Sequence, residues 1–317
     1  MRYSGRSYYD GYFRRKTYGS LYQLLVRFLL VWTIAYFLTC VFLYFRQEYI
    51  IYRVSKTVAI AAPSDRGFGL DYQDVWLTFP DSSSRIHGWW FDAPSQQQPV
   101  VAIPNEPVNV LSTPKTMLYL CGRGGSKTHY NNLARIKGFQ QLGFSVLAFD
   151  YRGYGLSEGP LPNESRLYED SQTAWNYLTQ VRNIPAEDIV IYGESLGGAV
   201  AIDLATRQPE AGGLIVQSSF TSMAEQIRQL RPGLRIFPLS LIIHQRFNSL
   251  AKVRSLKIPV LFIHGTEDSI VDYKMSRKLY YAAPEPKTLF YVPGGEHLRL
   301  YQPGKYSYLA AIEHFVN

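Results

Sequence analysis

The stretch GESLG at Gly193–Gly197 decides the fold of this 317-residue chain. A strand-like apolar run, Asp188–Tyr192, precedes it, and a helix-like run, Gly198–Ala205, follows it. A serine on such a strand-to-helix turn is held with its Oγ exposed, and glycines flank it because the crowded turn leaves no room for Cβ atoms. The pattern predicts that Gly193–Gly197 is a nucleophile elbow, with Ser195 as the nucleophile at the edge of a sheet. The alternative is an ordinary turn with a solvated serine.

Two loops downstream of Ser195 carry the other groups that a hydroxyl nucleophile needs. Asp268 follows the strand-like run Ile258–Ile263, and His297 follows the strand-like run Lys287–Val292. Both would lie just beyond the carboxyl ends of strands, where an open α/β sheet binds its ligands. A serine hydroxyl is inert at its free pKa, so a neutral imidazole must take its proton and a carboxylate must orient that imidazole. The order Ser195, Asp268, His297 therefore predicts a catalytic triad.

Other side chains compete for two of these roles. His297 is favoured as the base because it lies in a glycine-bearing loop after a strand and downstream of the acid. His264 ends a strand but precedes the acid, so we expect it to be a structural hydrogen-bonding residue. Glu267 and Asp272 are the competitors of Asp268 as the orienting carboxylate.

Two backbone N–H groups are expected to form an oxyanion hole. One belongs to Leu196, the residue after the nucleophile, and the other comes from the loop after an early strand. That strand is predicted at Thr116–Cys121 and the loop at Gly122–Ser126, so the N–H of Arg123 is the best second donor. The Arg123 guanidinium is open to two interpretations, a contact with an anionic substrate or simple solvation.

Five stretches of the chain together resemble the α/β-hydrolases, in particular single-span, membrane-anchored serine hydrolases. That branch includes bacterial proteins described as peptidases or esterases and animal protein depalmitoylases. The similarity runs from about residue 72 to the C-terminus, and the matching stretches are Leu118–Gly122, Phe149–Gly155 with Ser157, Gly193–Gly198, His264–Asp268 and Gly294–His297. The resemblance implies the α/β-hydrolase fold and the same triad, Ser195, Asp268 and His297.

One departure from the family concerns the oxyanion loop. The family usually has His-Gly-Asn where this chain has Cys121, Gly122 and Arg123. The family's histidine in that loop is not the catalytic base, so the departure leaves the triad intact and affects the shape of the loop. Cys121 is predicted to be a buried thiol rather than a nucleophile, because no histidine-containing elbow surrounds it.

The turn Asp150–Gly155 follows a strand-like run, Ser145–Phe149. Asp150 and Arg152 are well placed in it to pair with one another or with backbone groups. We therefore expect loop architecture beside the site, in preference to a direct contact with substrate.

Helix and strand patterns alternate through the second half of the chain. This predicts a mostly parallel, doubly wound sheet in one domain, residues 71–317. The first strands are predicted at Tyr72–Phe79 and Arg85–Phe91, joined by a polar turn at Pro80–Ser84, and Pro94–Pro114 is predicted to be an irregular surface loop.

The segment 220–255 departs from that alternation. It lies between the strand-like runs Gly213–Gln217 and Ile258–Ile263, and it combines many apolar residues with several arginines. In α/β-hydrolases an insertion here covers the mouth of the site, so the resemblance implies a small cap whose apolar side shapes an acyl pocket. Plain helices packed on the sheet are an equally open interpretation.

An apolar segment near the N-terminus predicts a transmembrane helix at residues 21–45. Phe28–Phe45 carries no charge over roughly 18 residues, which is enough to cross the hydrocarbon of a bilayer. It also lacks the polar face of a buried amphipathic helix. A cleaved signal peptide is the main rival, but its apolar region would be shorter and a small-residue cleavage site would follow closely. We favour an uncleaved anchor, with a basic tail at 1–20 and a connector at 46–70.

Charged residues beside the span predict its orientation. The tail has one acid, Asp10, against five basic residues: Arg2, Arg6, Arg14, Arg15 and Lys16. The positive-inside bias puts the N-terminus in the cytoplasm and the hydrolase domain on the opposite (periplasmic, lumenal or extracellular) side. The lipid bilayer is therefore an expected partner.

Composition excludes other classes of function. The net charge is +8, but the sequence has no zinc-ligand spacing, no RNA-recognition motif and no compact Lys/Arg run in the catalytic region. Nucleic acid is therefore not an expected partner. The two cysteines, Cys40 and Cys121, form no convincing disulfide framework. The predicted site implies no metal and no organic cofactor.

These observations together predict a membrane-anchored serine hydrolase that cleaves an ester or thioester in a small-molecule or acylated substrate. Ser195 would attack to form an acyl-enzyme, His297 would move the proton and Asp268 would orient it. A serine peptidase or amidase with the same triad is a second hypothesis. A non-catalytic anchored binding protein with a relic triad is a third. Specificity resides in the shapes of cap and pocket, which a triad does not encode.

Overall fold

The computed structural model describes residues 6–52, 67–79, 84–94, 111, 113–124, 127–301 and 305–317, apart from the side chains of 6–20, 305 and 306. The chain divides into two compact units, Met1–Gln47 and Glu48–Asn317. Several predictions fall outside the described residues. These are 53–66 of the connector, 80–83 of the polar turn, 95–110 and 112 of the irregular loop, and 125–126 of the oxyanion loop.

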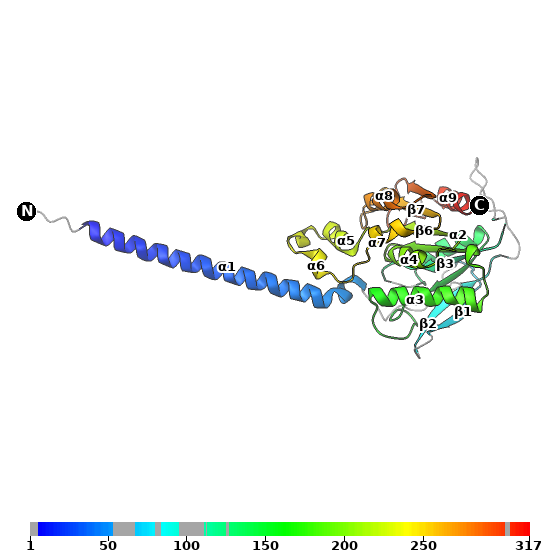
Figure 1. Ribbon diagram of the computed structural model, residues 1–317, viewed down its shortest axis with the longest axis horizontal. Coiled ribbons are helices and arrows are strands. Elements are labelled where there is room, and N and C mark those ends of the chain that lie inside the picture. Colours follow the sequence, from blue (N-terminus) through cyan, green and yellow to red (C-terminus); the bar gives the residue numbers. More distant parts are fainter. Residues whose placement is uncertain are drawn as a thin grey trace, which may run out of the picture. The chain divides into compact units, whose positions relative to one another are not determined.

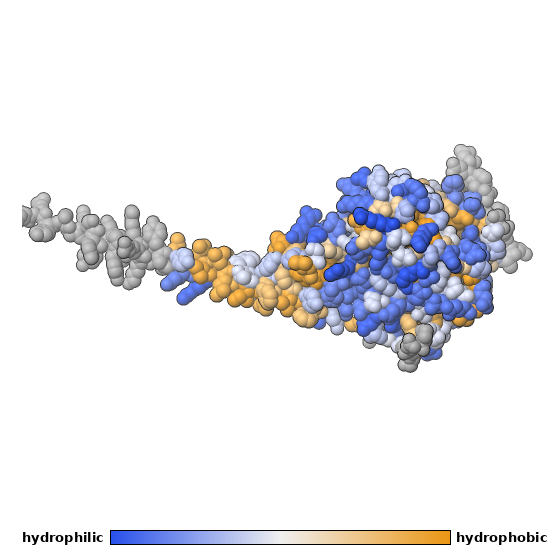
Figure 2. Space-filling view, viewed as in Figure 1, coloured by the Kyte–Doolittle hydropathy of each residue, from blue (hydrophilic) through white to orange (hydrophobic). Residues whose placement is uncertain are grey.

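The first unit is formed by α1 (Arg6–Tyr52), whose last turn belongs to the second unit. From Leu21 onward α1 is long and apolar enough to cross a membrane, a test of length and composition that a signal sequence near the N-terminus also passes. Its 32 residues from Leu21 to Tyr52 extend about 48 Å, against a hydrocarbon thickness of about 30 Å. Figure 2 shows the apolar colour running along the described part of this helix.

The side chains of α1 fit an apolar surrounding. Large apolar residues such as Phe28, Trp32 and Phe37 are exposed. The hydroxyls of Thr33 and Thr39 donate to backbone carbonyls one turn earlier, at 2.8 Å each, so they need no water. The helix also continues past residue 45, so the segment predicted as a connector begins as helix as far as Tyr52.

The second unit is built on one eight-stranded sheet in the order β1-β2-β4-β3-β5-β6-β7-β8 (Figure 1). The first two pairings, β1 with β2 and β2 with β4, are antiparallel, and all the others are parallel. The strands are β1 (Gln73–Thr78), β2 (Arg85–Phe91), β3 (Lys115–Leu120), β4 (Phe144–Phe149), β5 (Ile189–Glu194), β6 (Gly213–Gln217), β7 (Val260–Gly265) and β8 (Lys287–Val292). The predicted mostly parallel, doubly wound sheet is confirmed.

The central strands are apolar along their whole length because both of their faces are covered. Every residue of β6 and β7 is buried, and in β5 only Glu194 is partly exposed. This is the pattern that a parallel sheet between two helical layers requires. It explains why unbroken apolar runs, rather than alternating ones, marked these strands in the sequence.

Helices cover the sheet on both faces. On one face α3 (Glu164–Asn176), α4 (Leu196–Arg207), α7 (Ser249–Lys252) and α8 (Tyr273–Ala282) contact one another in that order. On the other face lie α2 (Tyr130–Gln141) and α9 (Lys305–Val316), where Arg135 and Tyr308 reach the β3 and β5 tyrosines. A π-helical turn, Tyr177–Val181, and a 3-10 turn, Ala186–Asp188, lie between α3 and β5.

The segment between β6 and β7 folds into short helical pieces. They are α5 (Met223–Leu230), a 3-10 turn at Pro232–Ile236, α6 (Leu239–Ile242), α7 and a 3-10 turn at Val253–Ser255. Leu239 and Ile242 are buried, whereas Leu241 is 82% exposed. The segment is therefore helical, and its role as a cap over the site stays a prediction.

Candidate active site

The turn between β5 and α4 holds Ser195 in a strained backbone conformation. Its φ is +53° and its ψ is −118°, a region that a residue with a side chain rarely adopts. A Cβ at Gly193 would clash with the carbonyl of Gly197, and one at Gly197 would clash with the carbonyl of Leu120. The two glycines of the motif are therefore required by close backbone approach.

Hydrogen bonds from β6 and from the loop after it fix the strained residue. The N–H of Ser195 donates to the carbonyl of Gln217 at 2.8 Å, and the hydroxyl of Ser219 donates to the carbonyl of Ser195 at 2.8 Å. Both the N–H and the carbonyl group of Ser195 are therefore hydrogen-bonded, and its hydroxyl is left for other partners. Ser195 is half-buried and lies directly beyond β5.

The structure brings Ser195, His297 and Asp268 together. His297 Nε2 lies 3.1 Å from Ser195 Oγ, and His297 Nδ1 lies 2.7 Å from Asp268 Oδ2. The acid follows β7 and the histidine follows β8, so parallel strands deliver both loops to the edge of the sheet where the elbow stands. With Nδ1 protonated, the imidazole donates to the carboxylate and accepts from the serine hydroxyl.

Asp268 is the most heavily hydrogen-bonded member of this set. Its Oδ1 accepts from the N–H groups of Ile270 at 2.9 Å and Val271 at 2.8 Å. Burial opposes ionisation of this carboxyl, but hydrogen bonds from His264, His297 and Val271 outweigh that effect and hold its pKa well below the usual range. Asp268 therefore stays negatively charged beside the imidazole.

The competing residues make other contacts. Asp272 caps the first turn of α8, where its Oδ1 accepts from the N–H of Lys274 at 2.8 Å. Glu267 is exposed. The carboxylate that meets His297 is therefore that of Asp268.

His264 is buried beneath the acid. Its Nδ1 lies 2.6 Å from the Ser276 hydroxyl, and its Nε2 lies 2.9 Å from the Val271 carbonyl and 3.1 Å from Asp268 Oδ2. These contacts agree with the structural role that the sequence predicted. The direct contact with Asp268 was not predicted, although the spacing of four residues between the two side chains is a signal for it.

The loop after β3 passes directly against the elbow. A Cβ on Gly122 would lie 3.3 Å from Ser195 Cβ and 3.2 Å from the carbonyl oxygen of Glu194, so the loop and the nucleophile are in close contact. Leu196 opens α4, and the first N–H groups of a helix have no partner within it. Leu196 and Gly122, the residue before Arg123, thus lie on two segments next to the serine, and the N–H groups of Leu196 and Arg123 stay the predicted oxyanion donors.

The Arg123 side chain is exposed, and its guanidinium also has a partner within the protein. Its Nη2 donates to the backbone carbonyl of Ile50 at 2.7 Å. The neighbouring Cys121 is fully buried, and burial raises the pKa of its thiol well above the usual value. Cys121 is therefore a neutral buried thiol, as predicted.

A buried ion pair beneath the elbow was not predicted. Arg135 of α2 pairs with Glu194, the residue before the nucleophile, and also donates to Tyr119 Oη at 2.9 Å and Asn132 Oδ1 at 2.6 Å. Arg135 is only 1% exposed, so breaking this pair would leave an uncompensated charge. A polar pair three residues apart, Asn132 and Arg135, on an otherwise apolar helix face was the available signal.

The turn Asp150–Gly155 is held by two separate ion pairs. Asp150 accepts from the N–H of Lys127 at 2.9 Å and from its ammonium at 2.5 Å. Arg152 instead binds Asp170, with Nε to Oδ1 at 2.6 Å. The expected pairing of Asp150 with Arg152 is thus wrong, because each meets a different element. The contact of Asp150 with the backbone N–H of Lys127 agrees with the predicted pairing with backbone groups. These contacts also agree with a structural role for the turn beside the site.

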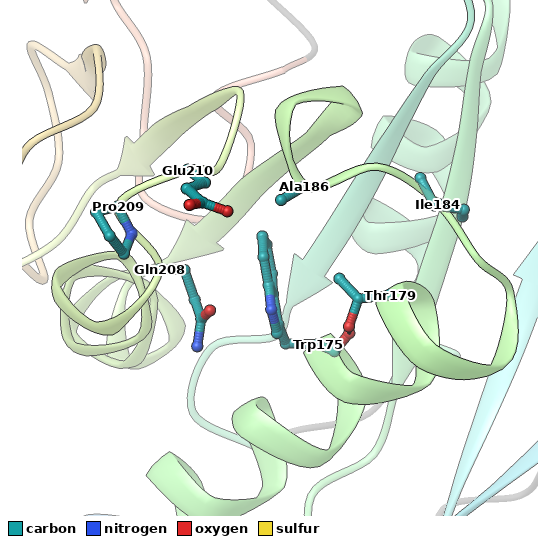
Figure 3. A pocket seen from close by; sticks show the side chains of 7 residues that line it. All are labelled: Trp175, Thr179, Ile184, Ala186, Gln208, Pro209 and Glu210. Atoms are coloured by element: carbon teal, nitrogen blue, oxygen red, sulfur yellow. The ribbon is translucent and has the colours of Figure 1, made fainter.

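A separate pocket of about 340 Å³ lies away from this edge (Figure 3). Its lining comes from the ends of α3 and α4 and from the segment before β5: Trp175, Thr179, Ile184, Ala186, Gln208, Pro209 and Glu210. Those segments enter the amino end of β5, whereas Ser195 follows its carboxyl end. The pocket therefore belongs to the opposite edge of the sheet. In the described part of the chain, no group of three His, Cys, Asp or Glu side chains could hold a metal ion.

Comparison with known proteins gives the same assignment of fold. The chain matches the family described as "Serine aminopeptidase, S33" over residues 112–252 and 239–303. An uncharacterised protein of Mycobacterium tuberculosis is 34% identical over 257 residues, which is 81% of this chain and 82% of that protein. The α/β-hydrolase domain-containing protein WAV2 of Arabidopsis thaliana is 29% identical, over 74% of this chain and 75% of its own.

A solved structure supports the same architecture. The esterase Pf2001 of Pyrococcus furiosus has a TM-score of 0.64 and 21% sequence identity, and the likeness covers 83% of this chain and 96% of that one. At this level of identity the likeness shows the fold alone.

Proposed function

Since the chain belongs to the serine aminopeptidase (S33) family of α/β-hydrolases, we propose that it is a membrane-anchored serine hydrolase that cleaves an ester or thioester bond. One observation carries the proposal. Ser195 Oγ, His297 and Asp268 form a hydrogen-bonded series, with distances of 3.1 Å and 2.7 Å. A hydroxyl, a base and an orienting carboxylate in that order are what nucleophilic acyl transfer requires.

The proposed reaction begins with acylation. His297 Nε2 takes the proton of Ser195 Oγ while that oxygen attacks the carbonyl carbon of the substrate. The backbone N–H groups of Leu196 and Arg123 stabilise the oxyanion that forms. His297 then gives its proton to the departing alcohol or thiol, and an acyl-enzyme remains. Water activated by the same imidazole attacks the acyl-enzyme and releases the acid.

Asp268 keeps the imidazole of His297 in the tautomer that this reaction needs. Its negative charge beside Nδ1 fixes the tautomer in which Nε2 is free to accept a proton. The same charge stabilises the imidazolium that forms during attack. The lowered pKa of this carboxyl keeps that support in place across neutral and mildly acidic pH.

The helical segment 220–255 is proposed to act as a cap. It carries apolar side chains between β6 and β7, next in the chain to the loop that bears Ser218 and Ser219. A cap of this kind would bind the acyl chain and leave the ester or thioester at Ser195. Peptide hydrolysis would need room for a chain on both sides of the bond, which is why ester and thioester substrates are preferred. A peptidase or amidase is the second candidate, favoured by the description of the matching family.

Anchoring and orientation complete the proposal. The apolar length of α1 supports an uncleaved membrane helix. The five basic residues before residue 17 support a cytoplasmic N-terminus, which would place the hydrolase domain on the opposite side of the membrane.

A substrate panel tests the proposed reaction. Detergent-solubilised protein is given p-nitrophenyl esters, acyl thioesters and peptide p-nitroanilides, and each is repeated with Ser195→Ala. Ser307→Ala, an exposed serine of α9, is the matched control. We expect turnover of esters or thioesters that only Ser195→Ala abolishes. Turnover confined to the peptide amides would favour the second candidate, and folded wild type inactive on the whole panel would favour a non-catalytic protein.

A further inference from the structure

The last turn of α1, Glu48–Tyr52, is built into the second unit. Ile51 is 6% exposed and Tyr52 is 1% exposed, so the end of this turn is buried, whereas Tyr49 and Ile50 before it are exposed. Hydrogen bonds join it to three different segments, which follow β3, β4 and β6 in the chain. All of these segments lie within Glu48–Asn317.

The first contact comes from the oxyanion loop. The Arg123 guanidinium donates to the carbonyl of Ile50 at 2.7 Å. The last carbonyls of a helix lack intrahelical partners and carry partial negative charge, so a cation is favoured there. Arg123 follows Gly122, which touches the elbow at Ser195. One side chain therefore ties the loop beside the nucleophile to the end of α1.

The second contact comes from the turn after β4. Tyr154 Oη donates to the carbonyl of Tyr52 at 2.6 Å, and both side chains are almost completely buried. Burial raises the pKa of Tyr154 well above the ordinary value, so this hydroxyl remains a donor at any pH at which the protein is folded.

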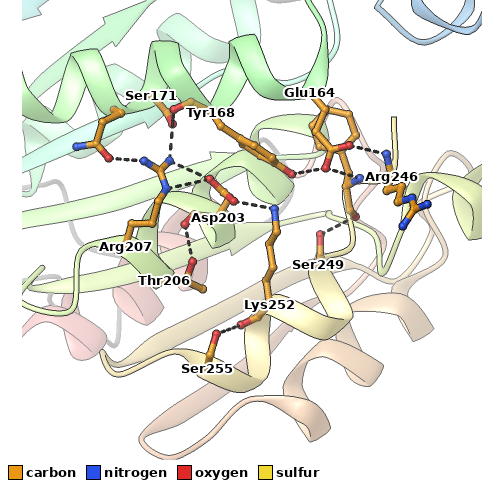
Figure 4. A network of polar contacts seen from close by, with 12 residues as sticks. Glu164, Tyr168, Ser171, Asp203, Thr206, Arg207, Arg246, Ser249, Lys252 and Ser255 are labelled. Carbon is orange, nitrogen blue, oxygen red and sulfur yellow. Dashed lines mark hydrogen bonds and ion pairs between the residues drawn. The ribbon is translucent and has the colours of Figure 1, made fainter. Parts of the chain in front are cut away.

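The third contact comes from the end of the segment between β6 and β7. Tyr52 Oη donates to Gln245 Oε1 at 2.5 Å, and the same Oε1 accepts the N–H of Glu164 at 2.6 Å. The Glu164 carboxylate in turn accepts the N–H groups of Arg246 and Phe247, at 2.5 and 2.8 Å. Figure 4 shows Glu164 meeting both Tyr168 and Arg246.

The oxyanion loop needs such a support because its own sequence gives it little rigidity. Gly122, Gly124 and Gly125 flank Arg123, and Gly124 has a φ of +90°. Glycine loses more conformational freedom on ordering than any other residue, so a glycine-rich loop is costly to hold in one geometry. An oxyanion hole acts through donors that are already in place before reaction. A side-chain anchor at Arg123 supplies that order.

We propose that Arg123 is a positioning residue, which holds the oxyanion loop by binding the end of α1, and that Glu48–Tyr52 is a working part of the active site. This inference rests on the proposed function. It means that the arginine standing in place of the family's asparagine contributes through its side chain to rate, and not to substrate binding. It also means that activity depends on the turn where the membrane helix enters the domain.

Substitution of Arg123 tests the positioning role in the full-length protein. Arg123→Ala keeps the backbone N–H but loses the anchor, so we expect kcat for a p-nitrophenyl ester to fall about tenfold to a hundredfold with KM changed less than about twofold. Loss of a whole oxyanion donor costs about a hundredfold to a thousandfold, and a loosened one should cost less. Arg123→Lys, which can still donate to the carbonyl, should recover part of the rate. Arg277→Ala, an exposed arginine of α8, is the matched control.

A double substitution distinguishes an indirect role from a direct one. Tyr52→Ala loosens the same turn, so Arg123→Ala should add little further loss of kcat in that background. Tyr154→Phe, which removes one hydroxyl and keeps the ring, gives a milder version of the same comparison if Tyr52→Ala folds poorly. Effects that multiply, or a raised KM in Arg123→Ala, would show a direct substrate contact and overturn the inference.

A separate measurement distinguishes failure of the proposed function from failure of the positioning role. Labelling of wild type by a fluorophosphonate reports an activated Ser195 whatever Arg123 does. Wild type and Arg123→Ala that label at the same rate would overturn the positioning role alone. A folded wild type that is not labelled would overturn both.

Discussion

Asp268 accepts more hydrogen bonds than an orienting carboxylate strictly needs. Two histidines reach its Oδ2, His297 at 2.7 Å and His264 at 3.1 Å, while two backbone N–H groups reach its Oδ1. The first contact serves the proposed catalytic imidazole. The others hold the carboxylate in one place and keep it ionised inside the protein.

Asp268→Asn should therefore remove catalysis while preserving shape. An amide NH2 facing His297 Nδ1 would favour the tautomer that carries its proton on Nε2, which cannot accept the Ser195 proton. We expect kcat to fall about a thousandfold to ten-thousandfold, as for the equivalent change in other serine triads. Steady-state hydrolysis of a p-nitrophenyl ester measures this. Asp272→Asn alters the side chain at the N-terminus of helix α8 and does not touch His297, so this variant should keep most activity. Equal losses of activity in the two variants would contradict the assignment of Asp268 as the orienting carboxylate.

The lowered pKa of Asp268 also predicts how stability depends on pH. An unfolded aspartate titrates near pH ~3.9, and the folded one titrates below that, so the folded state binds this proton more weakly. The stabilisation is complete above about pH 4 and is lost as pH falls toward the folded pKa. The Tm of wild type should then fall more steeply than that of Asp268→Asn between about pH 4 and pH 2. Parallel thermal-melting curves would refute this assignment of charge.

The strand–turn–helix from β5 to α4 depends on close backbone packing. A Cβ at Gly197 would clash with the backbone carbonyls of Leu120 and Cys121, which cannot move without displacing β3. Gly197→Ala should lower the free energy of unfolding by about 3 kcal/mol or more, the upper end for overpacking, and should abolish ester hydrolysis. Gly233→Ala is the matched control, since nothing lies within 4 Å of its added Cβ. Denaturant unfolding compares the two variants, and equal stabilities would rule out the packing argument.

The helical segment between β6 and β7 carries the prediction about chain length. If it forms a cap over the acyl pocket, Phe237→Ala and Leu241→Ala should lower the preference for long over short acyl esters by about tenfold, the effect of losing one or two methylene contacts. Ratios of kcat/KM for p-nitrophenyl acetate, octanoate and palmitate measure it. Tyr281→Ala, an exposed residue of α8, serves as the control. An unaltered preference would leave these helices as plain packing on the sheet.

The elements that the sequence predicted are those determined by local pattern. Unbroken apolar runs marked β5, β6 and β7 to within about two residues, because strands buried on both faces admit no polar alternation. GESLG predicted the elbow, because the close backbone approach at this turn requires glycine at positions 193 and 197. The residues of the proposed triad were chosen from their places after strands, and the structure brings them together.

Two of the unpredicted contacts join elements far apart in the chain. Arg135 and Glu194 are 59 residues apart, and Arg123 and Ile50 are 73 apart. In the sequence alone, Arg135 and Arg123 are typical of solvated charges. Only the folded structure shows which partner each of them contacts. The expected Asp150–Arg152 pair failed for the same reason, since Lys127 and Asp170 arrive from other segments. The continuation of α1 past residue 45 was missed because a helix need not stop where its apolar residues do.

The division of the whole chain into an apolar helix and a catalytic domain predicts its behaviour in membranes. An uncleaved span should keep the protein in the pellet after an alkaline carbonate wash and release it in detergent. An N-terminal epitope tag should stay attached to that membrane fraction, and immunoblotting measures both properties. A protein found in the wash, or one that has lost its tag, would show a cleaved signal sequence instead.

An activated serine at position 195 is the central claim, and labelling by a tagged fluorophosphonate tests it most directly. Full-length protein in detergent is treated beside Ser195→Ala and His297→Ala, with His314→Ala as an exposed control, and the labelled peptide is mapped by mass spectrometry. We predict that the label lies on Ser195, requires His297 and is unaffected in His314→Ala. Folded wild type that takes no label, or a label that survives in Ser195→Ala, would contradict the claim.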